Sequence, residues 1–138
     1  MRQGGDMGNR VLHFEIHASD MARAQEFYTE VFGWKFEDWT KFAGMPYFGI
    51  TTGEDSEPGI NGGLMQRRGE APTDTSAVNG GVLTVGVDDY DAAHEKILAA
   101  GGVATVPKYA LPGMAWQGYY KDTEGNIFGI HQPDEKAA

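Results

Sequence analysis

The alternation of apolar and polar residues near the start of the chain predicts a strand followed by a helix. Residues 11–17, VLHFEIH, alternate with a period of two, which is typical of a strand with one buried face and one ionisable face. Ser19 is expected to cap the following helix, with Asp20 adding negative charge at its positive end. Apolar residues then recur at steps of three and four, and the helix is expected to end at Gly33.

Short segments rich in aromatic or branched residues follow this helix. We expect hairpin strands at 34–39, 47–52 and 60–66, because Gly, Pro or Asn separates each from the next. The next segment, 67–80, is polar and contains turn-forming residues, so it is expected to be a surface connection. The first part of the chain is therefore expected to form a strand, a helix and three strands.

The same order of elements is expected again in the second half. A strand at 82–87 precedes a helix that Asp88 is expected to cap, and extended segments follow near 103–106, 116–121 and 126–131. Shifting the numbering by 69 aligns identical residues in the two helical regions: Asp20 with Asp89, Ala24 with Ala93, Glu26 with Glu95 and Gly33 with Gly102. The sequence therefore predicts a repeated module.

This repeat predicts an α+β fold in which two βαβββ modules form a cupped, partly closed mixed sheet. A single domain is expected over 9–133, with module one at 9–66, a linker at 67–80 and module two at 81–133. Residues 1–8 and 134–138 are expected to be flexible tails. The side chains on the polar face of the first strand, His13, Glu15 and His17, are expected to point into the cleft that the two sheets enclose.

Composition and charge narrow the classes of function. The chain has 138 residues, 41% of them hydrophobic, which suits one domain. Its net charge of −9 disfavours binding to nucleic acids or to anionic membranes. It contains no cysteine, which excludes thiolate metal sites and cysteine nucleophiles. Because no apolar run is long enough to span a bilayer or serve as a signal peptide, a cytoplasmic location is expected.

Three groups of residues in this chain resemble a known family. They are HFEI at 13–16 leading to Asp20, FY at 27–28 with VFGW at 31–34, and KDTEGNI at 121–127. Together they resemble the vicinal oxygen chelate superfamily, which includes glyoxalases, extradiol dioxygenases, and bleomycin or fosfomycin resistance proteins. The resemblance implies paired βαβββ modules that form a cup, and it implies a homodimer, since small members often pair.

The resemblance carries over only one of the family's metal ligands. Metal-dependent members place one ligand on the first strand and one on the last strand of each module, and His13 matches the first of these places. The corresponding places in the second module hold Val82 and Gly129, and residues 62–65 offer no acidic or imidazole group. We therefore expect no resident metal cofactor. The alternative is a displaced divalent site built from His13, Glu15 and His131.

The leading functional hypothesis is the binding of a small apolar or aromatic molecule in the cup. Its expected ligand-binding residues are His13, Glu15, Trp116, Tyr120 and His131. Trp116 and Tyr120 share a strand face with Gly118 between them, which leaves a gap for a flat ligand, or else the rings pack on the helix. Residues 108–114 are either a lid over the cup or a hairpin connection.

Two other hypotheses remain open. The first is a metal-dependent lyase, isomerase or dioxygenase of the glyoxalase type, in which Glu15 is the candidate catalytic base. The second is a structural dimer module that has no enclosed cavity. His94 is expected to be a surface or partly packed histidine, and His17 to be solvated near the end of its strand.

Overall fold

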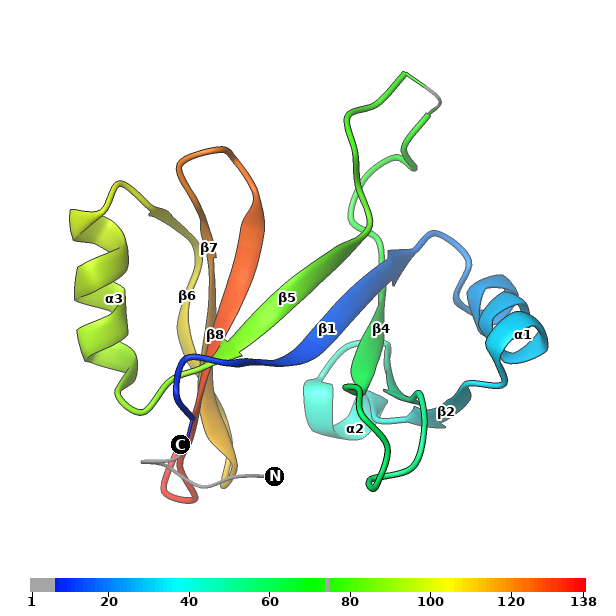
Figure 1. Ribbon diagram of the computed structural model, residues 1–138, viewed down its shortest axis with the longest axis horizontal. Coiled ribbons are helices and arrows are strands. Elements are labelled where there is room, and N and C mark those ends of the chain that lie inside the picture. Colours follow the sequence, from blue (N-terminus) through cyan, green and yellow to red (C-terminus); the bar gives the residue numbers. More distant parts are fainter. Residues whose placement is uncertain (1–6, 74) are drawn as a thin grey trace. The chain divides into compact units, whose positions relative to one another are not determined.

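The computed structural model describes residues 7–73 and 75–138, and the chain divides into two compact units (Figure 1). The N-terminal unit is His13–Gly81. The C-terminal unit combines residues 7–12 with Val82–Ala138. Each unit is built around one βαβββ module, so the predicted α+β class and the predicted repeat are confirmed.

The first module contains four strands and two helices. Their bounds are β1 (Val11–Ala18), α1 (Met21–Phe32), β2 (Lys35–Asp38), α2 (Thr40–Ala43), β3 (Tyr47–Thr51) and β4 (Gly62–Gln66). The strand order is β2-β3-β4-β1, in which β1 and β4 are parallel and the other neighbours are antiparallel. The short helix α2 was not predicted, because a single turn is too short to show a helical periodicity.

The second module repeats this arrangement with one helix. Its elements are β5 (Gly81–Gly86), α3 (Tyr90–Ala99), β6 (Val103–Leu111), β7 (Ala115–Lys121) and β8 (Ile127–Pro133). The strand order is β5-β8-β7-β6, with β5 and β8 parallel. Strand β6 runs through most of the segment that was expected to be either a lid or a hairpin connection. A tight turn at Gly113, φ +74°, leads directly into β7, so this segment is a hairpin.

The two long helices begin at equivalent aspartates. The carboxylates of Asp20 and Asp89 accept hydrogen bonds from the backbone N–H groups of Arg23 and Ala92, each at 3.0 Å. The predicted caps, Ser19 and Asp88, are therefore wrong by one residue in each helix. The true caps are one of the identical pairs of the 69-residue repeat, so the repeat marks the helix starts better than local residue preference does.

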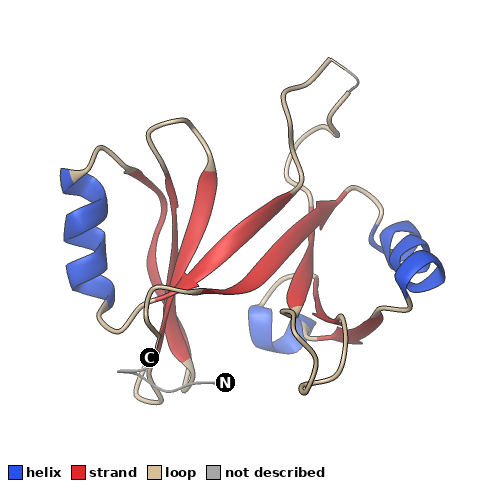
Figure 2. Cartoon of the chain, viewed as in Figure 1, coloured by secondary structure: helices blue, strands red, loops and turns tan. Residues whose placement is uncertain are grey.

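Each of the two long helices, α1 and α3, packs on one face of its own sheet (Figure 2). In the N-terminal unit the buried residues of this core are Ala18, Ile50 and Leu64. In the C-terminal unit they are Val87, Tyr90, Tyr120 and Ile130. Because side chains along a strand alternate between the two faces of a sheet, the strand residues next to these core residues lie on the opposite face.

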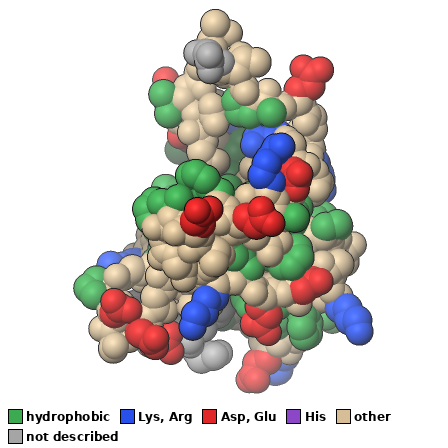
Figure 3. Space-filling view, turned by 90° about the vertical axis from the view of Figure 1, so that its right-hand side faces the viewer, with side chains coloured by type: hydrophobic (Ala, Val, Ile, Leu, Met, Phe, Trp, Pro, Cys, Tyr) green, Lys and Arg blue, Asp and Glu red, His purple; other side chains and the backbone are tan. Residues whose placement is uncertain are grey.

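The outward side of α1 is unusually apolar. Phe27, Val31 and Phe32 are each more than half exposed, and Figure 3 shows hydrophobic side chains among acidic ones on this side of the molecule. Tyr28 stacks on Trp34 at a centroid distance of 5.0 Å.

The expected homodimer stays a prediction. Within the described part of the chain, no helix combines the length and the apolar character needed to cross a membrane.

The flexible tails expected at 1–8 and 134–138 stay a prediction, but two residues in these segments make contacts. Residues 1–6 lie outside the described residues. Met7 is 1% exposed, and its backbone N–H donates to the carboxylate of Asp88 at 3.2 Å. At the other end, the N–H of Gly113 donates to the carbonyl of Ala137 at 2.8 Å, and Ala137 is 3% exposed. Backbone hydrogen bonds and burial therefore hold the described ends of the chain against the C-terminal unit.

Candidate functional site

The polar face of the N-terminal sheet carries two of the predicted ligand-binding residues. Phe14 and Ile16 pack toward the α1 side, so His13 and Glu15 lie on the opposite face of β1. Residue Glu15 is only 3% exposed. In the parallel pairing of β1 with β4, Glu15 lies opposite Gly63.

Two glycines allow aromatic rings to lie directly on this face. Gly49 of β3 and Gly63 of β4 are paired across the sheet. A Cβ atom at Gly49 would lie 2.6 Å from the indole of Trp39, and one at Gly63 would overlap the hydroxyl of Tyr47. The rings of Trp39 and Tyr47 are nearly parallel, with an interplanar angle of 8° and centroids 6.3 Å apart. We call these two rings, resting on the two glycines, the aromatic floor.

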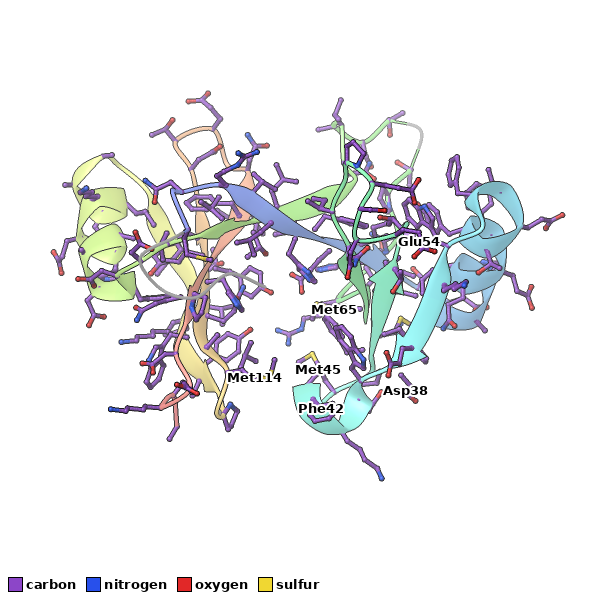
Figure 4. All side chains as sticks on the ribbon, turned by 60° about the horizontal axis from the view of Figure 1, so that its bottom comes forward. Asp38, Phe42, Met45, Glu54, Met65 and Met114 are labelled. Atoms are coloured by element: carbon purple, nitrogen blue, oxygen red, sulfur yellow. The ribbon has the colours of Figure 1, made fainter. Side chains whose placement is uncertain are left out.

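The predicted residue His13 joins this floor through a hydrogen bond. Its Nε2 atom lies 3.0 Å from the hydroxyl of Tyr47. Other elements of the N-terminal unit also carry apolar side chains. Figure 4 shows Met65 on β4, with Phe42 on α2 and Met45 just after it. Phe42 is 79% exposed. The face therefore combines aromatic and thioether surface with an imidazole and a buried carboxyl group.

His17 lies at the end of the same strand in a basic environment. Burial is the main cause that lowers the pKa of His17 from its usual value, and the nearby charges of Arg67 and Arg68 lower it further. The Arg67 guanidinium also donates to the backbone carbonyl of His17 at 2.9 Å. His17 is half-buried rather than solvated as expected, and its imidazole is favoured in the neutral form.

The equivalent face of the C-terminal sheet holds His131. In the strand pairing, Gln117 lies opposite His131 and Thr84 lies opposite Gly129. The Nδ1 atom of His131 is 2.8 Å from Oε1 of Gln117. Burial lowers the pKa of His131. The Nε2 atom of His131 and the hydroxyl of Thr84 are buried, and neither has a hydrogen-bond partner among residues 7–73 and 75–138.

Trp116 and Tyr120, the other predicted ligand-binding residues, lie on the face of β7 that packs against α3. Tyr120 is 1% exposed, and its hydroxyl donates to the hydroxyl of Tyr90 at 2.9 Å. A Cβ atom at Gly118 would overlap the Tyr90 hydroxyl, so a ring from α3 occupies the gap between the two aromatic residues. The indole of Trp116 packs on the same core. This placement matches the core-packing alternative.

His94 belongs to this buried network. Its Nδ1 atom lies 2.9 Å from the hydroxyl of Tyr120. Because that hydroxyl donates its proton to Tyr90, it accepts from His94. The expected partly packed histidine is therefore linked through Tyr120 to the core of the C-terminal unit.

The residues at the family's metal-binding places do not fit a metal. Gly63 and Gly129 occupy matching positions, opposite Glu15 and Thr84, which are themselves 69 residues apart. The Tyr47 hydroxyl fills the space at Gly63, while side-chain atoms of Gln117, Tyr119 and Thr84 surround Gly129. The described ranges, 7–73 and 75–138, contain no group of three or more His, Asp or Glu side chains arranged to hold a metal ion.

Sequence reasoning missed four residues of the two polar faces: Trp39, Tyr47, Thr84 and Gln117. A glycine inside a strand often marks a close approach of another group, and Gly49 and Gly63 provided that signal. The signal does not say which side chain approaches, because that depends on strand register.

Comparisons with known proteins agree with this architecture. Residues 10–52 match the family model described as bleomycin resistance protein-like N-terminal. The curated protein CFP32 of Mycobacterium tuberculosis, whose name suggests a glyoxylase, is 25% identical over 122 residues. That match covers 86% of this chain and 43% of the relative, so the chain spans less than half the length of this relative.

Solved structures share the fold. A glyoxalase/bleomycin resistance protein/dioxygenase superfamily member from Vibrio splendidus superposes with a TM-score of 0.59 at 16% identity, covering 89% of this chain and 97% of that one. Methylmalonyl-CoA epimerase from Mycobacterium tuberculosis gives a TM-score of 0.59 at 19% identity, covering 96% and 93%. The family model matches the first part of the chain and the solved structures share its fold, which supports the resemblance of this chain to the vicinal oxygen chelate superfamily.

Proposed function

We propose that this protein binds a small, flat, largely apolar organic molecule on the polar face of its N-terminal unit. The aromatic floor provides the stacking surface, and His13 and Glu15 provide the polar contacts. The observation that carries the proposal is that Gly49 and Gly63 allow two nearly parallel rings to lie against the sheet in the same unit as the buried residue Glu15. No resident metal is needed for this function.

The physical support for the proposal is preorganisation. The Trp39 indole rests against the backbone at Gly49, and the His13 imidazole holds the Tyr47 hydroxyl, so both rings are constrained before a ligand arrives. Trp39 is still 38% exposed, which leaves part of its surface for contact. Aromatic pairs contribute about 0.5–1.5 kcal/mol beyond the area that they bury. A rigid floor also reduces the side-chain entropy that binding would otherwise cost.

The experiment is an NMR titration of the 15N-labelled protein with 2-naphthol, a flat aromatic probe with one hydroxyl group. We expect saturable shifts of the backbone amides of Gly49 and Gly63. The Gly49→Ala variant should bind at least about 5-fold more weakly, because the new Cβ displaces the Trp39 indole. Gly80→Ala is the matched control, since a Cβ there meets nothing within 4 Å.

Two results would contradict the proposal. The first is equal affinity of the wild type and Gly49→Ala. The second is a set of shifted amides that leaves out β3 and β4. A parallel titration of Trp39→Leu keeps the test informative if Gly49→Ala is poorly folded, because this substitution removes the indole without adding a group at the backbone.

Glu15 supports an enzymatic alternative. Residue Glu15 is only 3% exposed, and a buried carboxyl group is a candidate for proton transfer. Methylmalonyl-CoA epimerase is among the proteins that share the fold. Incubation with methylmalonyl-CoA in deuterated water tests this alternative. Deuterium incorporation that is lost in Glu15→Gln would assign the epimerase-like reaction. Absence of incorporation in the wild type would leave the binding function as the better account.

A further inference from the structure

The C-terminal unit contains two buried polar atoms that residues 7–73 and 75–138 do not satisfy. Thr84 is 2% exposed and His131 is 9% exposed. The hydroxyl of Thr84 and the Nε2 atom of His131 have no hydrogen-bond partner in the described chain. Native proteins leave few buried polar atoms unpaired, because each forfeits its hydrogen bonds with water. A partner for these two atoms must therefore come from outside the described residues.

The hydrogen bond on the other side of the imidazole determines what His131 offers. The Gln117 amide oxygen, Oε1, lies 2.8 Å from Nδ1 and can only accept, so Nδ1 carries the proton. The Nε2 atom then has a free lone pair and no proton. Burial lowers the pKa of His131, which keeps the ring neutral near pH 7. Nε2 is therefore an acceptor that lacks a donor.

A glycine lies beside both groups. Gly129 is paired with Thr84 on β5, and a Cβ at this glycine would lie 3.0 Å from the Gln117 amide nitrogen and 3.3 Å from the Thr84 hydroxyl. A larger residue at this position would crowd both side chains. Gly129 thus keeps a polar surface on this face of the sheet in the place where metal-dependent relatives carry a ligand.

We propose that His131 Nε2 and the Thr84 hydroxyl form a ligand-binding subsite for a neutral molecule with an O–H or N–H donor, such as an alcohol, a phenol or a primary amide. The ligand donates a hydrogen bond to Nε2 of His131. The Thr84 hydroxyl forms a second hydrogen bond with the ligand, either as donor or as acceptor. An anion without a proton to donate is rejected, because its lone pairs face the lone pair of Nε2. This subsite lies within the C-terminal unit and does not depend on the aromatic floor.

The test uses the 15N-labelled full chain and matched probes, phenol and anisole. Anisole has a similar ring, but its methyl ether cannot donate. Long-range 1H–15N correlations report directly on the two ring nitrogens of His131. We expect an unprotonated Nε2 in the free protein and a saturable change in its chemical shift with phenol. Affinity for anisole should be at least about 5-fold lower, the effect of one hydrogen bond of about 1 kcal/mol.

Two variants localise the effect. Thr84→Val should weaken phenol binding about 3-fold or more while leaving the tautomer of His131 unchanged. Thr51→Val, an exposed strand position, is the control and should bind phenol as the wild type does. Gly49→Ala should leave the His131 response unaffected, which separates this subsite from the aromatic floor. If a variant is poorly folded, the comparison of phenol with anisole in the wild type still tests whether the ligand must donate a hydrogen bond.

Three results would overturn the inference: a protonated Nε2 in the free protein, an Nε2 signal that does not respond to phenol, or equal responses to phenol and anisole. An Nε2 signal that is insensitive to phenol would assign the missing partner to an internal water molecule rather than to an organic ligand.

Discussion

The unpaired hydroxyl of Thr84 leads to an unusual prediction: removing it stabilises the free protein. Thr84 lies on β5 with 2% of its surface exposed, and its hydroxyl has no hydrogen-bond partner among the described residues. Valine has nearly the same shape, and its branched Cβ suits a strand equally well. The Thr84→Val substitution therefore replaces an unsatisfied polar atom with a methyl group and changes little else.

The size of the effect follows from the desolvation of the hydroxyl group. An unpaired buried hydroxyl costs about 1–3 kcal/mol, so Thr84→Val should raise the free energy of unfolding by about 1 kcal/mol. For a chain of this length, that corresponds to an increase in melting temperature of about 2–5 °C. Urea unfolding followed by circular dichroism measures the change, with an unaltered m-value as the sign of a simple stability effect.

The control is Thr51→Val, an exposed position on β3, which should change the free energy of unfolding by less than about 0.5 kcal/mol. A loss of stability in Thr84→Val would refute the reasoning, because it would show that the hydroxyl makes a favourable hydrogen bond in the free protein. Stabilisation combined with weaker phenol binding would instead show that this hydroxyl is kept for binding at a cost in stability.

Three further predictions concern packing and pH. Gly118→Ala places a Cβ on the Tyr90 hydroxyl and should destabilise the protein by about 1–3 kcal/mol in urea unfolding; a neutral effect would contradict the packing described. Tyr120→Phe removes the hydroxyl that links Tyr90 to an imidazole and should cost about 1–3 kcal/mol, and a fully stable variant would disprove the network. The pKa values of His17 and His131 are lowered in the folded state, so the unfolded chain binds more protons as the pH falls below 6.5. The free energy of unfolding should therefore decrease between pH 7.5 and 5.5, less so in His131→Gln, and a flat profile would contradict the burial of both rings.

Much of the fold could be predicted from the sequence because it depends on periodicity. The alternation at 11–17 places His13 and Glu15 on the face away from the core, as the structure confirms. The 69-residue shift predicts the second module and even pairs the two helix-capping aspartates. The caps themselves were displaced by one residue, because adjacent residues at both helix starts are all good cap formers.

The candidate sites were harder to predict because they depend on register. A period of two shows that Trp116 and Tyr120 share a face but not which face, and the helix takes it. The aromatic floor arises because Gly49 and Gly63 become neighbours only when β3 pairs with β4. No local pattern in the sequence contains that pairing.

The most direct test of the proposed function is a crystal structure of the protein soaked with 2-naphthol at saturating concentration. We expect density for the bicyclic ring stacked on Trp39 or Tyr47, with its hydroxyl within hydrogen-bonding distance of His13 or Glu15. Density only elsewhere on the molecule, with both rings unchanged on Gly49 and Gly63, would contradict it.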